Sequence, residues 1–539
     1  MDYQDLLEDI GSFGKYQKRV SVLLLLSLVP NALPLLMFAY TQYPTRFYCS
    51  TRDIGNGSQD ISHPMSLNQS FFQEQNTFNQ CGVLHENNTV LCKAERIYED
   101  DNTVIAEFGL VCENGWKVPI TASLYMAGLL LAQFFSNLAD RFGRRPIILV
   151  FSFLQFVMVG VVGCSWNYIS YAVFVFLSGF TGIIRYVCTF VLATEFLGEK
   201  RKTEIGAMCS IAYSVGYMIS PIFGYLFPYW RWYLWATSCV GILYIPLIWL
   251  LPESLRWLIV SGRIEEAKIL TKKIASVNGK NADVEKVFQN LSTKEEIEEK
   301  KVSLDNFDLE KEASYLHMMK NPTLRVRSCV MYLTGFISAT IYFGISLNPS
   351  QLSGNRLLNI FLSGLVEIPA ILSTYFLIQR YGRSRICFLF LIVGGTSCTV
   401  VPFTKENQPI LANAFVLLGK FAITGAFFMM YVVIGEITPT LVRSTSLGLA
   451  SASARLGGIV MPFLFFAGQA AGEQNLPMLA MGGMALLGGY LFLRFIPETR
   501  GYPMPDSVLD AVNNKRVYGI QVCQDFTEDK SRKDQHYVA

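Results

Sequence analysis

The chain has 539 residues, of which 51% are hydrophobic and 16% are charged, and its formal net charge is +3. This composition is too apolar and too segmented for a soluble globular protein of this length, and the nearly neutral charge gives no indication of nucleic-acid binding. Apolar windows of about 20 residues, long enough to cross about 30 Å of hydrocarbon, recur along the chain. The composition therefore predicts an all-α membrane protein.

The first apolar stretch follows an acidic and polar segment, residues 1–19, that has no features of a cleavable signal peptide. We therefore expect a cytoplasmic N-terminus and a retained first span. The hydropathy pattern predicts twelve transmembrane helices in two six-helix bundles, at 20–251 and 328–496. The predicted spans are 20–41, 119–138, 146–165, 168–193, 205–227, 233–251, 328–347, 357–378, 385–403, 409–434, 447–470 and 476–496.

The loop 42–118 between the first two spans is large and polar. Cysteines together with glycosylation acceptors indicate an oxidising, extracellular face. We expect glycosylation and disulfides in this loop, with three pairings of four cysteines left open. The loop holds N-x-S/T acceptors at Asn56, Asn68 and Asn87, and cysteines at Cys49, Cys81, Cys92 and Cys112.

An even number of spans then predicts that both termini are cytoplasmic. The short loops agree, since basic residues such as Arg141, Arg144 and Arg145 concentrate on the predicted cytoplasmic side. The segment 252–327 is charge-rich and is expected to be a solvated cytoplasmic linker, in which Ile264 to Val277 predicts an amphipathic helix. The polar segment 497–539 is expected to be a flexible cytoplasmic tail.

Two short motifs occur at equivalent places in the two predicted bundles. L-A-D-R-F-G-R-R follows the second span at Leu138 to Arg145, and I-Q-R-Y-G-R-S follows the eighth span at Ile378 to Ser384. Such an internal repeat predicts two related bundles that face each other.

These turns resemble the loop motif of the major facilitator superfamily, G-x-L-A-D-R-x-G-R-R, although Ser136 and Gln379 depart from it. The chain also contains P-E-S-L-R-W-L from Pro252, P-E-T-R-G from Pro497, and further matching segments. With Glu107–Cys112, Ser123–Gly128 and Tyr342–Asn348, the whole chain resembles the organic cation/anion/zwitterion transporter family, and most of all its organic cation/carnitine branch. The resemblance implies a plasma-membrane carrier that works by alternating access.

Four charged residues lie well inside predicted spans: Arg185, Glu367, Lys420 and Arg455. Each costs ~3 kcal/mol at the bilayer centre unless it is paired or hydrated, so such residues mark a solute pathway. Arg455 lies in a stretch of small residues that favours close helix packing. Three positive charges favour an anionic substrate group, whereas Glu367 attracts a cationic group.

In the resembled family, carriers of zwitterions have a basic residue at the position of Arg455 and an acidic one at Glu367. We hypothesise that Arg455 binds a substrate carboxylate and that Glu367 attracts the nitrogen of a carnitine-like or betaine-like substrate. The resemblance adds cavity candidates, including tyrosines for cation–π contacts. These candidates are Asn31, Tyr213, Tyr342 and Tyr431. Arg185 is a further candidate because it is a charged residue inside a predicted span.

Alternatives stay open at this point. One alternative is that Glu367 pairs with Arg455 or with Lys420 in a structural charge network that does not bind substrate, because buried ions are usually paired. Lys420 is interpreted as a structural partner, and each tyrosine is as well explained by packing as by substrate contact. Arg185 departs from the carnitine branch, so a cavity-facing Arg185 would favour an organic anion or an altered zwitterion.

Acidic and basic residues alternate at the predicted cytoplasmic ends of both bundles. We expect them to tie the halves together in the outward-open state, although the arginines alone are also explained by topology. The predicted gating residues are Asp140, Arg144, Glu195, Arg201, Glu253 and Arg256 in the first half and Glu436 and Arg443 in the second.

No P-loop, metal-spaced His/Cys set or catalytic triad is found, so an enzyme is not expected and no cofactor or metal is predicted. Coupling to Na⁺ stays open, with Glu436 a weak oxygen ligand candidate. The expected partners are a small organic zwitterion or ion and the lipid bilayer. Competing functions are organic anion exchange, cation uniport, sugar transport, and a solute sensor that binds without transporting.

Overall fold

The computed structural model describes residues 10–11, 13–43, 47–49, 82–85, 88–91, 96–98, 100–135, 138–197, 201–280, 288, 315–348, 352–439, 442–500 and 505. The glycosylation candidates Asn56, Asn68 and Asn87, like Cys81 and Cys92, lie outside these residues. Cys112 is disulfide-bonded, and its partner is not among the described side chains.

The twelve predicted spans are confirmed, since twelve described helices are long and apolar enough to cross a membrane. Several helices begin before the predicted apolar core, as α16 does at Pro322, because helical hydrogen bonding continues into the interface, where basic side chains such as the exposed Arg325 reach water. In the first half the helices are α2 (Lys15–Leu28), η1 (Val29–Asn31), α3 (Ala32–Thr41), α4 (Val104–Glu107), η3 (Cys112–Asn114), α5 (Lys117–Ala132), η4 (Gln133–Phe135), α6 (Leu138–Phe142), α7 (Arg144–Gly163), α8 (Tyr168–Leu197), α9 (Lys202–Leu226), α10 (Trp230–Cys239), η6 (Val240–Tyr244) and α11 (Leu247–Leu250). The linker contributes α12 (Leu255–Val260), α13 (Ile264–Asn278) and α15 (Tyr315–Lys320), and the second half contains α16 (Pro322–Leu347), α17 (Arg356–Tyr381), α18 (Arg383–Thr404), α19 (Pro409–Ile437), α20 (Arg443–Ala470) and α21 (Leu476–Phe495).

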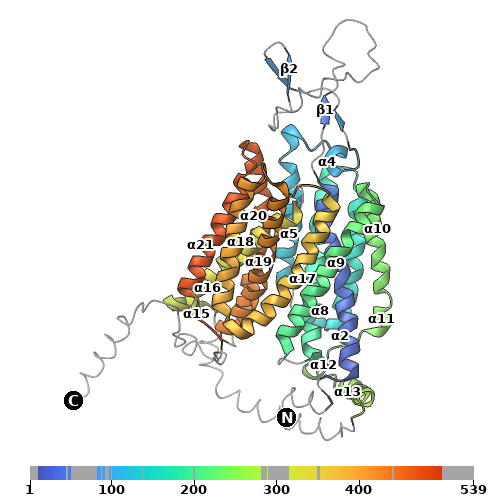
Figure 1. The fold of residues 1–539 in the computed structure, drawn as a ribbon. Coiled ribbons are helices and arrows are strands. Elements are labelled where there is room, and N and C mark those ends of the chain that lie inside the picture. The colour runs from blue at the N-terminus through green and yellow to red at the C-terminus, as the bar shows by residue number, and fades with distance from the viewer. Residues whose placement is uncertain are drawn as a thin grey trace, which may run out of the picture.

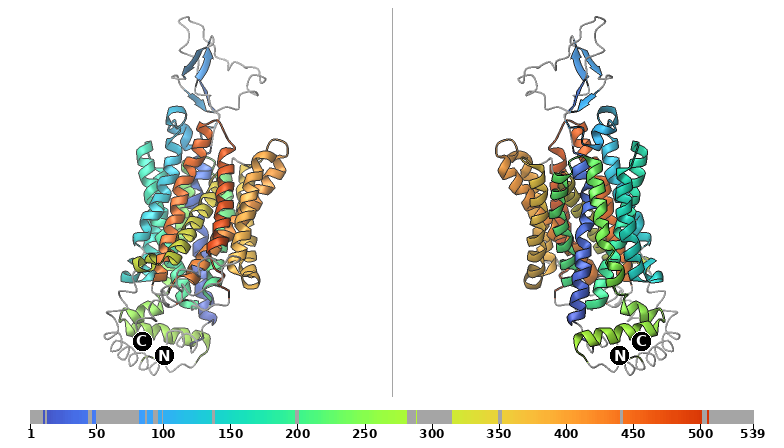
Figure 2. Two further views of the ribbon diagram at one scale, coloured as in Figure 1. Left: turned by 90° about the vertical axis from the view of Figure 1, so that its left-hand side faces the viewer. Right: turned by 90° about the vertical axis from the view of Figure 1, so that its right-hand side faces the viewer.

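The long helices stand side by side in two groups, one from each half of the chain (Figure 1). Two small antiparallel sheets, β1 (Phe47–Cys49) with β4 (Arg96–Tyr98) and β2 (Gly82–His85) with β3 (Asn88–Leu91), lie at one end of the bundle. The helices α12 and α13 lie at the opposite end (Figures 1 and 2). We refer to these as the strand end and the α13 end.

The two halves meet along a seam formed by α5 with α20 and α9 with α17. Small residues allow this close approach, because a side chain at Gly364 would begin 2.8 Å from the ring of Tyr217. Ser123 donates a hydrogen bond to the carbonyl of Ile459 at 2.7 Å across the same seam. The seam is thus a tight contact in which polar groups meet inside the membrane.

The first span is interrupted near its middle. A 3₁₀ turn, Val29–Asn31, separates α2 from α3 and contains Pro30, which cannot donate a helical hydrogen bond. The carbonyl of Val29 faces α9 at Gly216, where a β-carbon would lie only 1.7 Å from it. Breaks of this kind inside a span are found at functional positions. This one places Asn31 at the turn.

The helix predicted in the linker is present as α13, which ends at Gly279 in the left-handed conformation with φ 70°. The side chain of Asn278 accepts a hydrogen bond from the backbone N–H of Tyr16 at 3.0 Å and donates to the carbonyl of Ile10 at 2.8 Å. The linker helix is therefore anchored on the start of the first span.

Candidate functional site

A buried ion pair joins α17 and α19 in the second half. Lys420 Nζ lies 3.0 Å from Glu367 Oε1, and both side chains are almost completely buried. The carboxylate also accepts hydrogen bonds from Ser214 at 2.7 Å and from Tyr342 at 2.8 Å, while Lys420 donates to Ser346 Oγ at 2.8 Å. Each charge is thereby both paired and hydrogen-bonded, which is the condition for a tolerable buried pair.

This pair lies at the seam rather than inside one bundle. Ser214 and Tyr217 come from α9 of the first half, and the ammonium of Lys420 lies 4.3 Å from the centroid of the Tyr217 ring. The hydroxyl of Tyr217 donates to the carbonyl of Ser346 at 3.2 Å. Of the alternatives that the sequence left open, the structure shows the pairing of Glu367 with Lys420.

The guanidinium of Arg185 on α8 is fully buried within the first half. Its Nε donates to Gln155 Oε1 at 3.0 Å, and its Nη1 donates to the Ser27 carbonyl at 3.0 Å and to Tyr244 Oη at 2.6 Å. Its Nη2 donates to Asn31 Oδ1. All four acceptors are neutral, and no described carboxylate forms an ion pair with Arg185.

Arg455 on α20 is half-buried, and its Nε is buried without a hydrogen-bond partner. No carboxylate in the described part of the chain lies within ion-pair distance of it. The phenol of Tyr125 lies within electrostatic range of both Arg455 and Arg185, and that of Tyr186 is within range of Arg455. Arg455 therefore has an unused donor in the interior of the described structure.

The predicted cavity tyrosines are brought together from both halves. Tyr213 of the first half lies within electrostatic range of Glu367. In the second half, the rings of Tyr342 and Phe427 stack with centroids 6.0 Å apart, and Phe427 meets Tyr431 edge-on at 5.5 Å. The result is an aromatic environment around the interior charges.

Sequence reasoning missed Tyr125 and Tyr186 as members of this group. The sequence contained a signal for both tyrosines, since Tyr125 belongs to the family segment Ser123–Gly128 and Tyr186 directly follows Arg185. Among the side chains that accept from Arg185, Asn31 was a candidate, but Gln155 and Tyr244 were missed because they lie on other helices and carry no sequence signal of their own.

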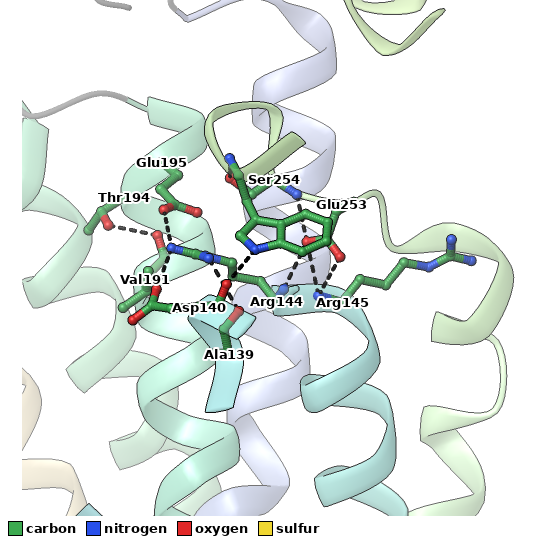
Figure 3. Close-up of polar contacts among 10 residues, drawn as sticks. Ala139, Asp140, Arg144, Arg145, Val191, Thr194, Glu195, Glu253 and Ser254 are labelled. Carbon is green, nitrogen blue, oxygen red and sulfur yellow. Dashed lines mark hydrogen bonds and ion pairs between the residues drawn. The ribbon is translucent and has the colours of Figure 1, made fainter. Parts of the chain in front are cut away.

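At the α13 end, Arg144 of the first half pairs with Asp140 at 2.8 Å and with Glu195 at 3.1 Å. The carboxylate of Glu253 accepts hydrogen bonds from the backbone N–H groups of Arg144 and Arg145 at 2.9 and 3.1 Å, at the start of α7 (Figure 3). An anion at a helix N-terminus is favourable for the helix dipole. These residues form the first-half cluster.

The second half repeats this arrangement. Arg383 pairs with Glu436 at 3.0 Å, and Glu498 accepts from the backbone N–H groups of Arg383 and Ser384 at 2.8 and 3.2 Å at the start of α18. The preceding glycine has φ 96° and faces Glu498 so closely that a β-carbon would not fit. Sequence reasoning did not include Arg383 and Glu498 among the gating candidates.

Three gating candidates lie outside the two clusters. Arg201 belongs to neither cluster: it pairs with Glu204 at 3.7 Å, and its guanidinium lies over the ring of Phe13. Arg256 is exposed, and Arg443 donates to the Thr438 carbonyl at 3.4 Å. The ion pairs described in the two clusters each join residues of the same half.

At the strand end, a contact between the halves does involve charge. The guanidinium of Arg356, at the start of α17, lies 3.5 Å from the ring centroid of Tyr43, directly after the first span. The hydroxyl of Tyr43 donates to Asp100. This chain of contacts links the loop, the first half and the second half.

Comparison with known proteins gives consistent matches. The family model described as sugar (and other) transporter matches residues 70–506. Human organic cation/carnitine transporter 2 is 31% identical, over 94% of this chain and 93% of that protein. The organic cation transporter protein of Drosophila melanogaster is 30% identical over 95% of both chains, and mouse solute carrier family 22 member 3 is 32% identical over 78% of this chain and 74% of its own.

Solved structures resemble the fold. The inward open xylose transporter XylE from E. coli has a TM-score of 0.62 at 14% identity and covers 92% of this chain and 99% of its own. XylE bound to 6-bromo-6-deoxy-D-glucose has a TM-score of 0.59 at 14% identity, over 92% of this chain and 98% of its own. At this identity the likeness concerns the fold alone.

Proposed function

The chain belongs to the sugar (and other) transporter family of the major facilitator superfamily, within its organic cation/carnitine transporters, and on this premise we propose that it carries small carboxylate-bearing organic ions across the plasma membrane. Zwitterions similar to carnitine or a betaine are the proposed principal substrates. Like its relatives, the protein is a transporter and not an enzyme. The substrate class is argued from the interior charges.

The observation that carries this proposal is that the guanidinium of Arg455 has no carboxylate partner among the described residues, while its buried Nε has no hydrogen-bond acceptor there. A charge retained inside a membrane without a protein counter-ion is costly, so its partner is expected to arrive with the substrate. The planar fork of arginine binds a carboxylate through two parallel hydrogen bonds, which lysine cannot do. We therefore assign Arg455 to the substrate carboxylate.

The positive end of a zwitterion needs a different partner. Lys420 already neutralises Glu367 at 3.0 Å, so that carboxylate is not free to attract a cation in this conformation. Aromatic faces attract quaternary and protonated nitrogens by cation–π contact. We assign the nitrogen to the rings around the interior charges, with Tyr213, Tyr342 and Tyr431 as the candidates, and regard Glu367 as the partner of Lys420.

The proposed transport cycle is alternating access by rocking of the two halves about the seam. The strand end is placed outside the cell, and both termini and α13 are placed in the cytoplasm, as the loop charges indicate. The two clusters at the α13 end keep the helix ends of each half together while the halves move. Coupling to Na⁺ is left to experiment.

The test is uptake of radiolabelled carnitine, tetraethylammonium and an aromatic carboxylate into cells that express the protein, each with and without Na⁺. Arg455→Ala is expected to reduce carnitine uptake about tenfold or more at unchanged surface amount, since a charged hydrogen bond is lost. Arg263→Ala, which alters an exposed arginine of the linker, is the control. Uptake of tetraethylammonium alone would refute the proposed substrate class.

A further inference from the structure

We infer that Arg185 sets the charge preference of the carrier without touching the substrate: its uncompensated positive charge favours carboxylate-bearing substrates over simple cations, and its contact with Asn31 turns the amide N–H donors of that residue toward the substrate. This inference rests on the proposed function and deepens it. Arg185 is a positioning residue, because it acts through the electrostatic potential and through Asn31.

The first step is the charge balance in the interior. Of the four charges predicted well inside the spans, Lys420 and Glu367 cancel each other as an ion pair. Arg185 and Arg455 remain, and neither is paired with a described carboxylate. The interior charges therefore sum to +2, and a substrate that brings a carboxylate reduces this excess, whereas a simple cation increases it.

The second step is the reach of the Arg185 charge. Its guanidinium has no exposed surface, so water does not screen it directly. Four neutral acceptors stabilise it but leave its net charge in place. Arg185 and Arg455 both act electrostatically on the phenol of Tyr125. In a surrounding of low dielectric constant, the electrostatic potential of a buried charge extends over longer distances than it does in water.

The third step is the orientation of the Asn31 amide. A guanidinium has donors only, so its contact with Asn31 requires the carbonyl oxygen Oδ1 to face Arg185. The Nδ2 group then points away from Arg185, and no acceptor for it is found among the described residues. Asn31 is half-buried at the break in the first span. Its free N–H groups suit an acceptor such as a carboxylate or hydroxyl oxygen.

The decisive variant is Gln155→Glu. Gln155 is buried on α7 and its Oε1 already lies 3.0 Å from Arg185 Nε, so glutamate supplies a counter-charge while keeping shape and hydrogen bond. We expect normal surface amounts and a ratio of carnitine uptake to tetraethylammonium uptake that falls about tenfold. The matched control is Gln17→Glu, a buried glutamine of α2 near the α13 end, which should leave the ratio unchanged.

Asn31→Asp is the second variant. It supplies a counter-charge at Nη2 of Arg185, where Gln155→Glu supplies one at Nε, and it removes the amide donors, so the same fall in the ratio is expected. This variant decides if Gln155→Glu does not reach the surface. Arg185→Lys retains the charge but loses the fork. Because the positive charge is retained, the ratio of carnitine uptake to tetraethylammonium uptake should stay near its wild-type value, whereas a role of the guanidinium fork alone would change it.

The outcomes are distinguishable. A wild-type protein that takes up none of the three probes refutes the proposed function. A wild-type protein that transports carnitine, with surface-expressed Gln155→Glu or Asn31→Asp that leave the ratio unmoved, overturns only the role of Arg185.

Discussion

The fourth spans of the two halves, α8 and α19, each bury one fully enclosed cation, and the two cations are stabilised in different ways. Lys420 on α19 has a carboxylate 3.0 Å away, whereas the acceptors of Arg185 on α8 in the described part of the chain are all neutral. At the α13 end, in contrast, the halves repeat the same contacts, Arg144 with Glu195 and Arg383 with Glu436.

The difference between interior and end has a physical reason. The turns at the α13 end need a glycine with positive φ, and an anion at the N-terminus of the following helix stabilises them. Both halves therefore contain the same glycine and carboxylate arrangement. The interior has no such backbone requirement. Its charges are free to differ between the halves, and we propose that this asymmetry sets the substrate preference.

The largest effect should follow from breaking the pair of the second half. Lys420→Ala leaves Glu367 buried and unpaired, which costs ~3–5 kcal/mol of stability. We expect a strongly lowered unfolding temperature of the detergent-purified protein and little of it at the cell surface. Adding Glu367→Gln should recover much of the loss, and failure of this rescue would mean that the pair is not the source of the effect.

A smaller effect is expected for the cation of the first half. Arg185→Ala removes a charge and leaves only neutral acceptors behind, in a polar space that water can fill, so a loss of ~2 kcal/mol is expected. The measurement is the same unfolding temperature. A loss larger than that of Lys420→Ala would contradict the distinction between the two cations.

The repeated clusters should respond alike. Glu195→Gln and Glu436→Gln each weaken a partly buried ion pair, and we expect a similar, several-fold slower turnover with substrate binding retained. Asp140→Asn should slow turnover less, because Asp140 is 69% exposed and exposed pairs are worth about 1 kcal/mol or less. Initial uptake rates per surface transporter test this, and unchanged rates in all three variants would argue against a role in gating.

The smallest effect concerns the strand end of the first half. Burial raises the pKa of Glu107, but hydrogen bonds from Arg231, Trp230 and Tyr229 outweigh it and hold this pKa below its ordinary value of 4.5. The contact therefore contributes stability that is fully present above pH 4.5 and is lost as the pH falls through the lower folded value. Unfolding temperatures measured from pH 7 to 3 should fall less for Glu107→Gln, and parallel curves would contradict this.

Much of the fold was predictable from the sequence, because hydropathy and turn motifs are local. The twelve spans, the two halves and the linker helix follow from apolar windows and amphipathic spacing. The resemblance of the turns after Leu138 and Ile378 likewise pointed to equivalent corners, which the structure shows with equivalent ion pairs. The family could be identified for the same reason, since its motifs are short and continuous.

By itself the sequence determined which charges lie inside the membrane, namely Arg185, Glu367, Lys420 and Arg455, but not which of them meet. The tertiary structure decided that Glu367 pairs with Lys420, that Arg185 is held by neutral groups, and that Arg455 keeps an unused donor. The reason is geometric: the contact of two side chains on different helices depends on how each helix is rotated and crossed, and hydropathy, which records only how apolar a segment is, carries no information on either.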